Sequence, residues 1–230
     1  MALQILYEDN HLLAVCKPVG LPTMGAAGGA ASLVTIAKDY IKAKYGKPGN
    51  VYLGIVSRLD SLATGVVLFA RTSKAAARLT ELFRTGGVKK RYLVVTEVPP
   101  VPDRGMCVDW VRKSEIQQRM QVASSQDPGA KQAQLRYRLL QRMGAAGLVE
   151  VELLTGRKHQ IRLQLSHRGW AVAGDRKYGA RMPWSSGIAL HARSLELRHP
   201  VRATPLRLVA PLPVAWQRWH ITADLDREGD

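Results

Sequence analysis

The stretch VSRLDSLATGVVLFART, residues 56–72, places two charged side chains directly before an apolar run. The run, residues 66–70, is typical of a buried strand. Arg58 and Asp60 stand two residues apart just ahead of it. A carboxylate at the end of a strand, facing a cleft, can act as nucleophile or as acid and base. From this segment alone, a surface ion pair between the two side chains is the favoured interpretation.

The net charge of the chain is unusual. In 230 residues, 34 Lys and Arg against 18 Asp and Glu give a formal charge of +16. Such an excess repels itself, and a polyanion such as nucleic acid is the usual partner. Residues 71–91 and 157–181 each hold seven cations and one acid, so the two segments could line one groove that binds phosphates. The alternative is a protein that is merely basic, with two solvated faces.

The cysteines and the chain start indicate an intracellular protein. Cys16 and Cys107 are far apart and form no CxxC pair, so a disulfide framework or structural zinc site is not expected. The first 15 residues lack a basic segment followed by an apolar one, and no apolar run approaches the ~20 residues that a membrane span needs. We therefore expect a cytoplasmic protein without membrane contact.

Short apolar runs divided by Gly and Pro predict a mixed fold. The first half predicts a hairpin that ends at 18–20, a mobile Gly- and Ala-rich loop at 20–32 and strands at 51–60, 65–72 and 89–98. The loop lacks the Gly-Lys-Ser/Thr ending of a phosphate-binding loop. Two helices are expected, one capped by Ser32 and stopped near Gly46, the other capped by Ser73.

In the second half, residues 106–130 are predicted to be irregular, and residues 136–156 to form a hairpin that turns at 144–147. No repeat or clear linker is visible. The fold class is therefore α+β, with a mixed, mostly antiparallel central sheet and flanking helices. We expect residues 1–230 to form a single domain.

The most specific stretch is LLTGRKHQIRLQLSHRG, residues 153–169. A helix ending near Gly169 would turn Ile161 and Leu165 inward, four residues apart, and would put His159 and Arg162 on one shared face. Nothing in the spacing pairs Arg162 with Asp60.

Other chemistries find little support. Tyr92, which follows three cations, could stack on a base or belong to the core. The six histidines show no HExxH motif, so no metal site is expected. No GxSxG supports a serine hydrolase, and a glycosidase would need two partnered carboxylates.

Six segments in order resemble the RluA-like family of RNA pseudouridine synthases. The chain opens with a strand pair and Lys-Pro-x-Gly, continues with SRLDSLATG and KKRYLVV, and follows with TGRKHQIRLQL and GDRKYG, before LHARSLELRHP. The similarity extends from about residue 5 to residue 212. It implies a central RNA-binding cleft, no cofactor, no metal and RNA (rRNA or tRNA) as the partner.

The resemblance also implies site residues. The catalytic aspartate falls on Asp60, and Arg58 would fill the gap left by a flipped uridine. Tyr92 would stack on the target base and assist proton removal from C5, and Arg162 would pair with Asp60. Further substrate contacts are expected at Thr64, Arg157, Lys158, His159 and Gln160.

Some positions depart from the family pattern. Ser57 replaces a common His, Ala63-Thr64 a common Thr-Ser, Gln164 a common His and Arg176 a common Pro. None of these removes the Asp, Tyr or Arg, so the departures bear on the choice of target.

The expected activity is isomerisation of uridine in structured RNA by cleavage of its glycosidic bond and reattachment through C5. The aspartate would act as nucleophile or would stabilise positive charge at C1′. The alternative is a catalytically silent RNA-binding or ribosome-assembly protein on the same fold. We expect a monomer that lacks the separate N-terminal RNA-binding module found in many relatives.

Overall fold

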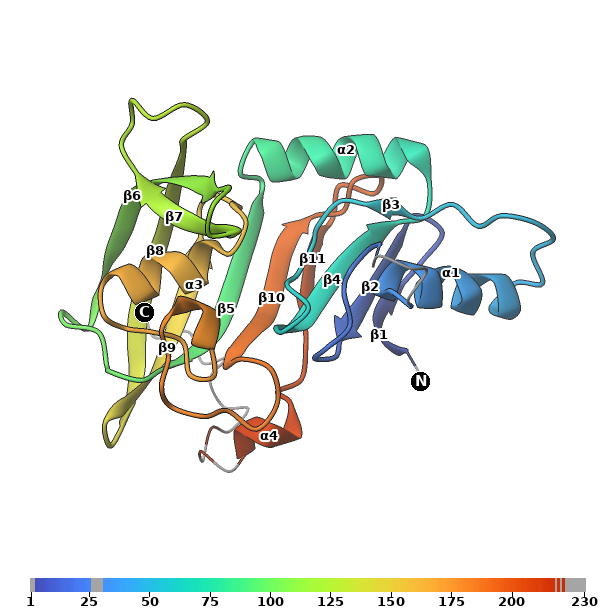
Figure 1. Ribbon diagram of the computed structural model, residues 1–230. Helices are drawn as coiled ribbons and strands as arrows, with labels where there is room; N and C mark the ends of the chain where they lie inside the picture. The colour runs from blue at the N-terminus through green and yellow to red at the C-terminus, as the bar shows by residue number, and fades with distance from the viewer. Residues whose placement is uncertain (1–2, 26–30, 218, 220, 222–230) are drawn as a thin grey trace. The chain divides into compact units, whose positions relative to one another are not determined.

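The computed structural model (Figure 1) describes residues 3–25, 31–217, 219 and 221. The chain divides into two compact units. Residues 1–88 with 192–230 form the terminal unit, and residues 89–191 form the central unit. No helix in the described ranges is long and apolar enough to span a membrane.

The terminal unit is a sheet with helices packed on its faces. Its sheet has the strand order β1-β2-β4-β10, with β3 added to β4 and β11 added to β10. The pairs β1/β2, β2/β4, β3/β4 and β10/β11 are antiparallel. The elements are β1 (Gln4–Glu8), β2 (Leu12–Lys17), α1 (Leu33–Lys44), β3 (Gly54–Ile55), β4 (Thr64–Ala70), α2 (Ser73–Arg84), β10 (Leu190–Arg198), β11 (Pro205–Val209) and α4 (Val214–Gln217).

The apolar run in β4 is buried because helices cover both faces of this sheet, as Figure 1 shows for α1 and α2. Successive strand residues point to opposite faces. Leu12 and Leu68 therefore pack with Leu79 of α2. Leu13 and Phe69, one residue along each strand, pack on the α1 side. Burial on both faces explains why the run shows no polar alternation.

Local capping signals set the helix starts. Ser32 caps α1 through a capping box with Thr35, as predicted. The cap of α2 is Thr72, whose side chain accepts from the Ala75 amide. The prediction of Ser73 as the cap was therefore wrong by one residue, because the backbone is still extended at Thr72. Of the loop predicted at 20–32, residues 26–30 lie outside the described part.

The strand predicted at 51–60 is reduced to β3, which has two residues. Side chains rather than a ladder hold the rest of this segment. The Ser57 hydroxyl accepts from Leu68 N at 3.2 Å and donates to Leu68 O at 3.3 Å. Ser57, which departs from the family pattern, thus has a structural role at β4.

The central unit is an antiparallel sheet with the strand order β5-β9-β8-β6-β7. Its elements are β5 (Val88–Thr96), β6 (Arg104–Ser114), β7 (Arg119–Ala123), β8 (Lys131–Met143), β9 (Ala146–Leu153), α3 (Gln160–His167) and the 3-10 helix η2 (Arg176–Tyr178). Most of β5 belongs to this unit, and the predicted hairpin at 136–156 is confirmed as β8 and β9.

The prediction of an irregular segment at 106–130 was wrong, because β6 and β7 form a hairpin there. Few side chains of β6 and β7 are fully buried. The two strands therefore need no regular alternation of apolar residues, and the sequence shows none. Val111 is buried against Ala133 and Leu163, and α3 covers this side of the sheet. Inside α3, Ile161 and Leu165 are both buried, as predicted. The α+β class with a mostly antiparallel sheet is confirmed.

Candidate active site

Asp60 lies in a tight turn just before β4. The Ala63 amide donates to the Asp60 carbonyl at 3.1 Å, and the Leu62 amide donates to Asp60 Oδ1 at 3.3 Å. A carboxylate that accepts from the backbone two residues ahead is held by its own turn. The turn therefore limits the positions that this side chain can take.

Lys17 holds the same turn through hydrogen bonds of its side chain. It was not among the predicted site residues. Its side chain is fully buried, and Nζ donates to the carbonyls of Pro18 at 2.7 Å, Leu21 at 2.9 Å and Ser61 at 3.1 Å. Burial lowers the pKa of Lys17 to about 8, while the negative charge of Asp60 opposes this shift. The Lys-Pro-x-Gly motif was the sequence signal that could have identified it.

Two more contacts tie residues 59–61 to the segment after β2. Thr23 Oγ1 donates to the Leu59 carbonyl at 2.8 Å and accepts from the Leu59 amide at 3.0 Å. The Gly20 amide donates to the Ser61 carbonyl at 2.8 Å. The turn with Asp60 is therefore fastened on both sides, which is the rigidity that a positioned catalytic group requires.

Thr64 opens β4 and lines a pocket of about 470 Å³ together with Lys17 and Leu21. Gly65 follows it with a φ of +117°, and a Cβ at this position would lie 2.2 Å from the Ala192 carbonyl oxygen of β10. Only glycine combines this backbone angle with such a close approach. The glycine after Thr64 therefore lets β10 pack directly beside the site.

Arg58 has a different environment from Asp60. It is exposed, and its Nη1 lies 3.8 Å from the sulfur of Met24. Asp60 is partly buried in its turn. This difference favours separate tasks for the two side chains over a simple surface ion pair.

Tyr92 lies in β5 of the central unit, opposite Val151 of β9. Desolvation raises the pKa of the Tyr92 phenol to about 12. The hydroxyl therefore stays protonated at neutral pH, so it can donate a hydrogen bond but is a poor base.

Arg162 is buried in α3 and forms a two-pronged ion pair with Asp175. Nε donates to Oδ2 at 2.6 Å and Nη2 donates to Oδ1 at 2.7 Å, with side-chain exposures of 2% and 0%. Such a fork holds the guanidinium plane in one orientation. The fork uses two of its five N–H donors. Asp175 belongs to the GDRKYG motif and was not among the predicted site residues.

Tyr178 connects His159 and Arg162. The Arg162 guanidinium carbon lies 4.9 Å from the centre of the Tyr178 ring. His159 Nδ1 lies 2.9 Å from the Tyr178 hydroxyl. His159 precedes α3 in a left-handed conformation, with a φ of 53°. His159 is therefore the residue directly before the helix. Tyr178 contacts both His159 and Arg162, which places these two side chains on the same side of α3.

Gln160 is buried and hydrogen-bonded within its own unit. Its Oε1 accepts from Thr155 Oγ1 at 2.8 Å and from the Arg157 amide at 2.9 Å, while Nε2 donates to Gln134 O and Gln164 Oε1, both at 3.0 Å. These bonds use both the oxygen and the nitrogen of the Gln160 amide, which favours a positioning role over RNA contact.

Gln164, another departure from the family pattern, continues this network. Its Nε2 donates to Asp109 Oδ2 at 2.6 Å, and Arg168 Nη1 binds the same oxygen at 2.9 Å. In contrast, Arg157 and Lys158 are exposed at the loop before α3, and Arg157 Nε donates to the Gln132 carbonyl at 2.9 Å. Exposed cations at a loop suit contact with phosphates.

The candidate residues fall into two groups. The terminal unit holds Arg58, Asp60 and Thr64. The central unit holds Tyr92, Arg157, Lys158, His159, Gln160 and Arg162. The pairing of Arg162 with Asp60 therefore stays a prediction. Among the described residues, no group of three or more His, Cys, Asp or Glu side chains could hold a metal ion.

Comparison with known proteins identifies the family. The family model described as RNA pseudouridylate synthase matches residues 11–167, a range that holds Asp60, Tyr92 and Arg162. Ribosomal large subunit pseudouridine synthase D of Xylella fastidiosa is 34% identical over 92% of the chain and 66% of its own length. Ribosomal large subunit pseudouridine synthase C of Rickettsia bellii is 32% identical over 93% and 70%. The chain thus spans about two thirds of the length of these curated relatives.

Solved structures agree with this result. Human RNA pseudouridylate synthase domain containing 4 superposes with a TM-score of 0.77 and 28% identity, over 94% of this chain and 93% of that one. Human RNA pseudouridylate synthase domain containing 1, with a TM-score of 0.71 and 23% identity, shares the fold. The chain therefore belongs to the RNA pseudouridylate synthase family, isomerases that act on RNA, and within it to the RluA-like branch.

Proposed function

We propose that this protein converts one or more uridines of large-subunit ribosomal RNA to pseudouridine. The two relatives above carry that substrate in their names and match more than nine tenths of the chain. The observation that carries the proposal is the fixed turn that presents Asp60, because it preserves the one carboxylate that the reaction needs. The reaction has no redox step, so no cofactor enters the proposal.

In this proposal, Asp60 acts at C1′ of the target nucleotide. A carboxylate held there either attacks C1′ or stabilises positive charge while the glycosidic bond breaks. Arg162, oriented by its fork with Asp175, pairs with Asp60 and keeps it ionised. The order of events at C1′ is left open in the proposal, since both routes use the same carboxylate.

Tyr92 stacks on the freed base and donates a hydrogen bond through its protonated phenol. Because its pKa is raised to about 12, Tyr92 remains a phenol and does not take the C5 proton itself. We assign it a hydrogen bond to the base that assists transfer of this proton to solvent. Arg58 enters the helix in place of the extruded uridine, which compensates in part for the loss of base stacking.

The remaining residues handle RNA contact and support. Thr64 and His159 face the target nucleotide, and Arg157 and Lys158 bind phosphates. Gln160 positions the loop before α3 and does not touch RNA. Residues 1–230 act as one catalytic domain, as a cytoplasmic monomer without an obligate protein partner. Both cysteines are free thiols, which suits a reducing compartment.

Release of tritium from RNA labelled at uridine C5 tests the activity. Large-subunit ribosomal RNA and a transfer RNA pool serve as parallel substrates. We expect release from the ribosomal RNA and none after Asp60→Ala, with RNA affinity unchanged within about threefold. RNA binding without release from either pool would return the silent RNA-binding alternative. Release by the Asp60→Ala variant would show that the catalytic carboxylate lies elsewhere.

A further inference from the structure

The end of α1 carries a cluster of cations that the proposed active site does not use. Lys42 and Lys44 lie in the last turn of the helix, and Lys47 follows it. All three are exposed, and the Lys47 amide donates to the Lys42 carbonyl at 3.1 Å, which brings their backbones together. Asp39 is the single acid among residues 38–52.

An exposed tyrosine accompanies these lysines. Tyr45 ends α1 with 45% of its surface exposed. Large aromatic side chains at this exposure, interleaved with cations, are typical of surfaces that bind single-stranded nucleic acid.

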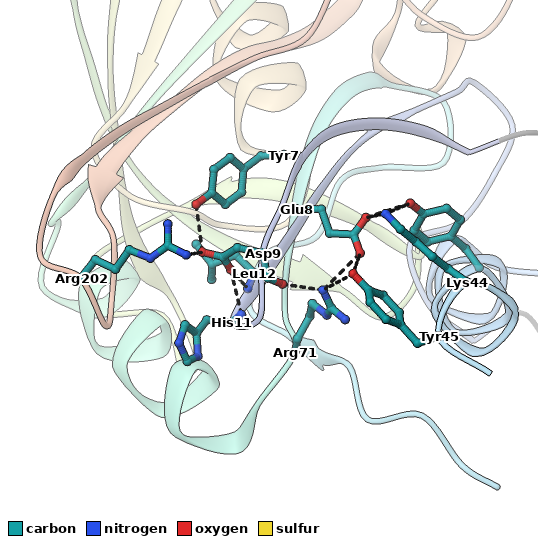
Figure 2. A network of polar contacts seen from close by, with 10 residues as sticks. Tyr7, Glu8, Asp9, His11, Leu12, Lys44, Tyr45, Arg71 and Arg202 are labelled. Atoms are coloured by element: carbon teal, nitrogen blue, oxygen red, sulfur yellow. Dashed lines mark hydrogen bonds and ion pairs between the residues drawn. The ribbon is translucent and has the colours of Figure 1, made fainter. Parts of the chain in front are cut away.

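Glu8 organises the cluster, as Figure 2 shows. Its carboxylate accepts from Lys44 Nζ at 2.8 Å, from the Tyr45 hydroxyl at 2.7 Å and from Arg71 Nη1 at 3.1 Å. Burial raises the pKa of Glu8, but the hydrogen bonds from Lys44, Tyr45 and Tyr40 lower it overall. The side chains around Glu8 are therefore held in place before any ligand arrives.

Two cations lie close to the ring of Tyr45. The Arg71 guanidinium carbon lies 4.6 Å and Lys44 Nζ lies 5.6 Å from the ring centre. A ring that is held by its hydroxyl and by a stacked guanidinium loses little freedom when a base stacks on its exposed part. This arrangement is a prepared stacking surface with phosphate-binding cations at its border.

We propose that this surface, the α1 platform (Lys42, Lys44, Tyr45, Lys47 and Arg71), binds a single-stranded or looped RNA segment outside the uridine that is modified. The platform rests on the proposed function, since it assigns a further contact to the same RNA substrate. A base stacks on the Tyr45 ring, and the lysines bind the adjacent phosphates. Its effect is on RNA affinity and not on the chemical step.

The test uses the double variant Lys42→Glu with Lys47→Glu and a labelled 30-nucleotide oligouridylate. We expect the dissociation constant to rise at least tenfold at 100 mM salt. The slope of log affinity against log salt should fall by about 1.4, since each phosphate contact to a single strand contributes ~0.7. In a second variant, Tyr45→Leu, loss of one stacked base should weaken binding by about tenfold without changing the slope.

The control is Lys113→Glu with Lys131→Glu in the central unit, which changes the net charge equally at exposed sites. We expect less than threefold weakening there. Equal weakening by both double variants would overturn the platform in favour of general charge attraction. Unchanged binding by the α1 variant would also overturn it, and would leave an acidic protein as the partner of this surface.

Turnover separates the platform from the proposed function. At saturating ribosomal RNA, the α1 double variant should release tritium at the wild-type rate, while at low RNA its rate should fall with affinity. If the wild type releases none, the proposed function fails, and the oligouridylate binding still decides the platform. A lower rate at saturation would contradict the assignment of the platform to affinity alone.

Discussion

At the scale of single residues, Lys17 shows how a buried cation can serve a carboxylate without a direct ion pair. Its three N–H donors meet three backbone carbonyls, one of which belongs to Ser61 next to Asp60. An ammonium group with every donor used is fixed in direction, and its charge acts on Asp60 through a buried environment. Lys17 therefore links the shape of the turn to the charge of its carboxylate.

Replacement of Lys17 by methionine should affect both stability and turnover. Methionine fills the same space but takes a donor from three carbonyls, of which only that of Ser61 keeps another one among the described residues, the Gly20 amide. We therefore expect the free energy of unfolding to fall by about 2–3 kcal/mol. We also expect turnover at saturating RNA to fall at least tenfold, because the Asp60 turn loses its anchor. Urea denaturation and tritium release measure the two effects.

The exposed Lys131→Met is the control and should change neither quantity. The pH dependence gives a second check on Lys17. Its folded pKa of about 8 lies below the ordinary value of 10.5, so the unfolded chain holds more protons between these pH values. Stability of the wild type relative to Lys17→Met should therefore rise from pH 8 to 10.5, by roughly 1.4 kcal/mol per pH unit at most. A difference that falls with pH would contradict the buried ammonium.

At the scale of elements, β4 packs against its neighbours in two ways, through side chains and through backbone atoms. Its middle residues are packed between α1 and α2, whereas its start at Gly65 touches the backbone of β10. The first contact tolerates changes among apolar residues of similar size, because a core accepts them with small losses. The second contact involves backbone atoms, which cannot move aside without displacing a strand.

Gly65→Ala should therefore be among the most destabilising single substitutions in the terminal unit. The added Cβ meets the Ala192 backbone at 2.2 Å, and the φ of +117° strains any residue other than glycine. We expect a loss of about 4 kcal/mol in the free energy of unfolding. Gly46→Ala has a φ of +57° and open space around it, so it should lose about 1 kcal/mol. Equal losses in urea denaturation would refute the close strand contact.

At the scale of the whole molecule, the net charge is +16, and several of the acids are used in ion pairs that stabilise the fold. Glu8, Asp9, Asp109 and Asp175 are each bonded to cations within a unit. These four acids are therefore used in ion pairs within the units, whereas cations such as Arg58, Arg157 and Lys158 face solvent. This distribution produces a positive surface without loss of a folded core.

RNA affinity should consequently depend strongly on salt. If six phosphates are neutralised, the affinity for structured ribosomal RNA should fall by about 10³-fold between 50 and 200 mM salt. Titration of labelled RNA across this range measures the slope. An affinity that changes less than threefold would show that binding is not governed by phosphate contacts, and would contradict the role assigned to the net charge.

The sequence alone determined the family and most elements, because both follow from local order. The motifs around Asp60, Tyr92 and Arg162, the capped helix at Ser32 and the hairpin of β8 and β9 are written in neighbouring residues. The extent of β3 and the existence of β6 and β7 could not be predicted in this way. β3 and β6 depend on β4 and β8, which follow later in the chain, and β7 depends on β6. None of the three has a clear apolar alternation.

Only the tertiary structure decided which side chains support the site. Lys17 meets Ser61 across 44 residues, Asp175 holds Arg162 and Ser57 bonds to Leu68. The sequence presented these residues as motif positions or as departures, without their partners. The physical reason is that burial makes each such polar group require a specific partner, and the partner is chosen by the fold rather than by sequence distance.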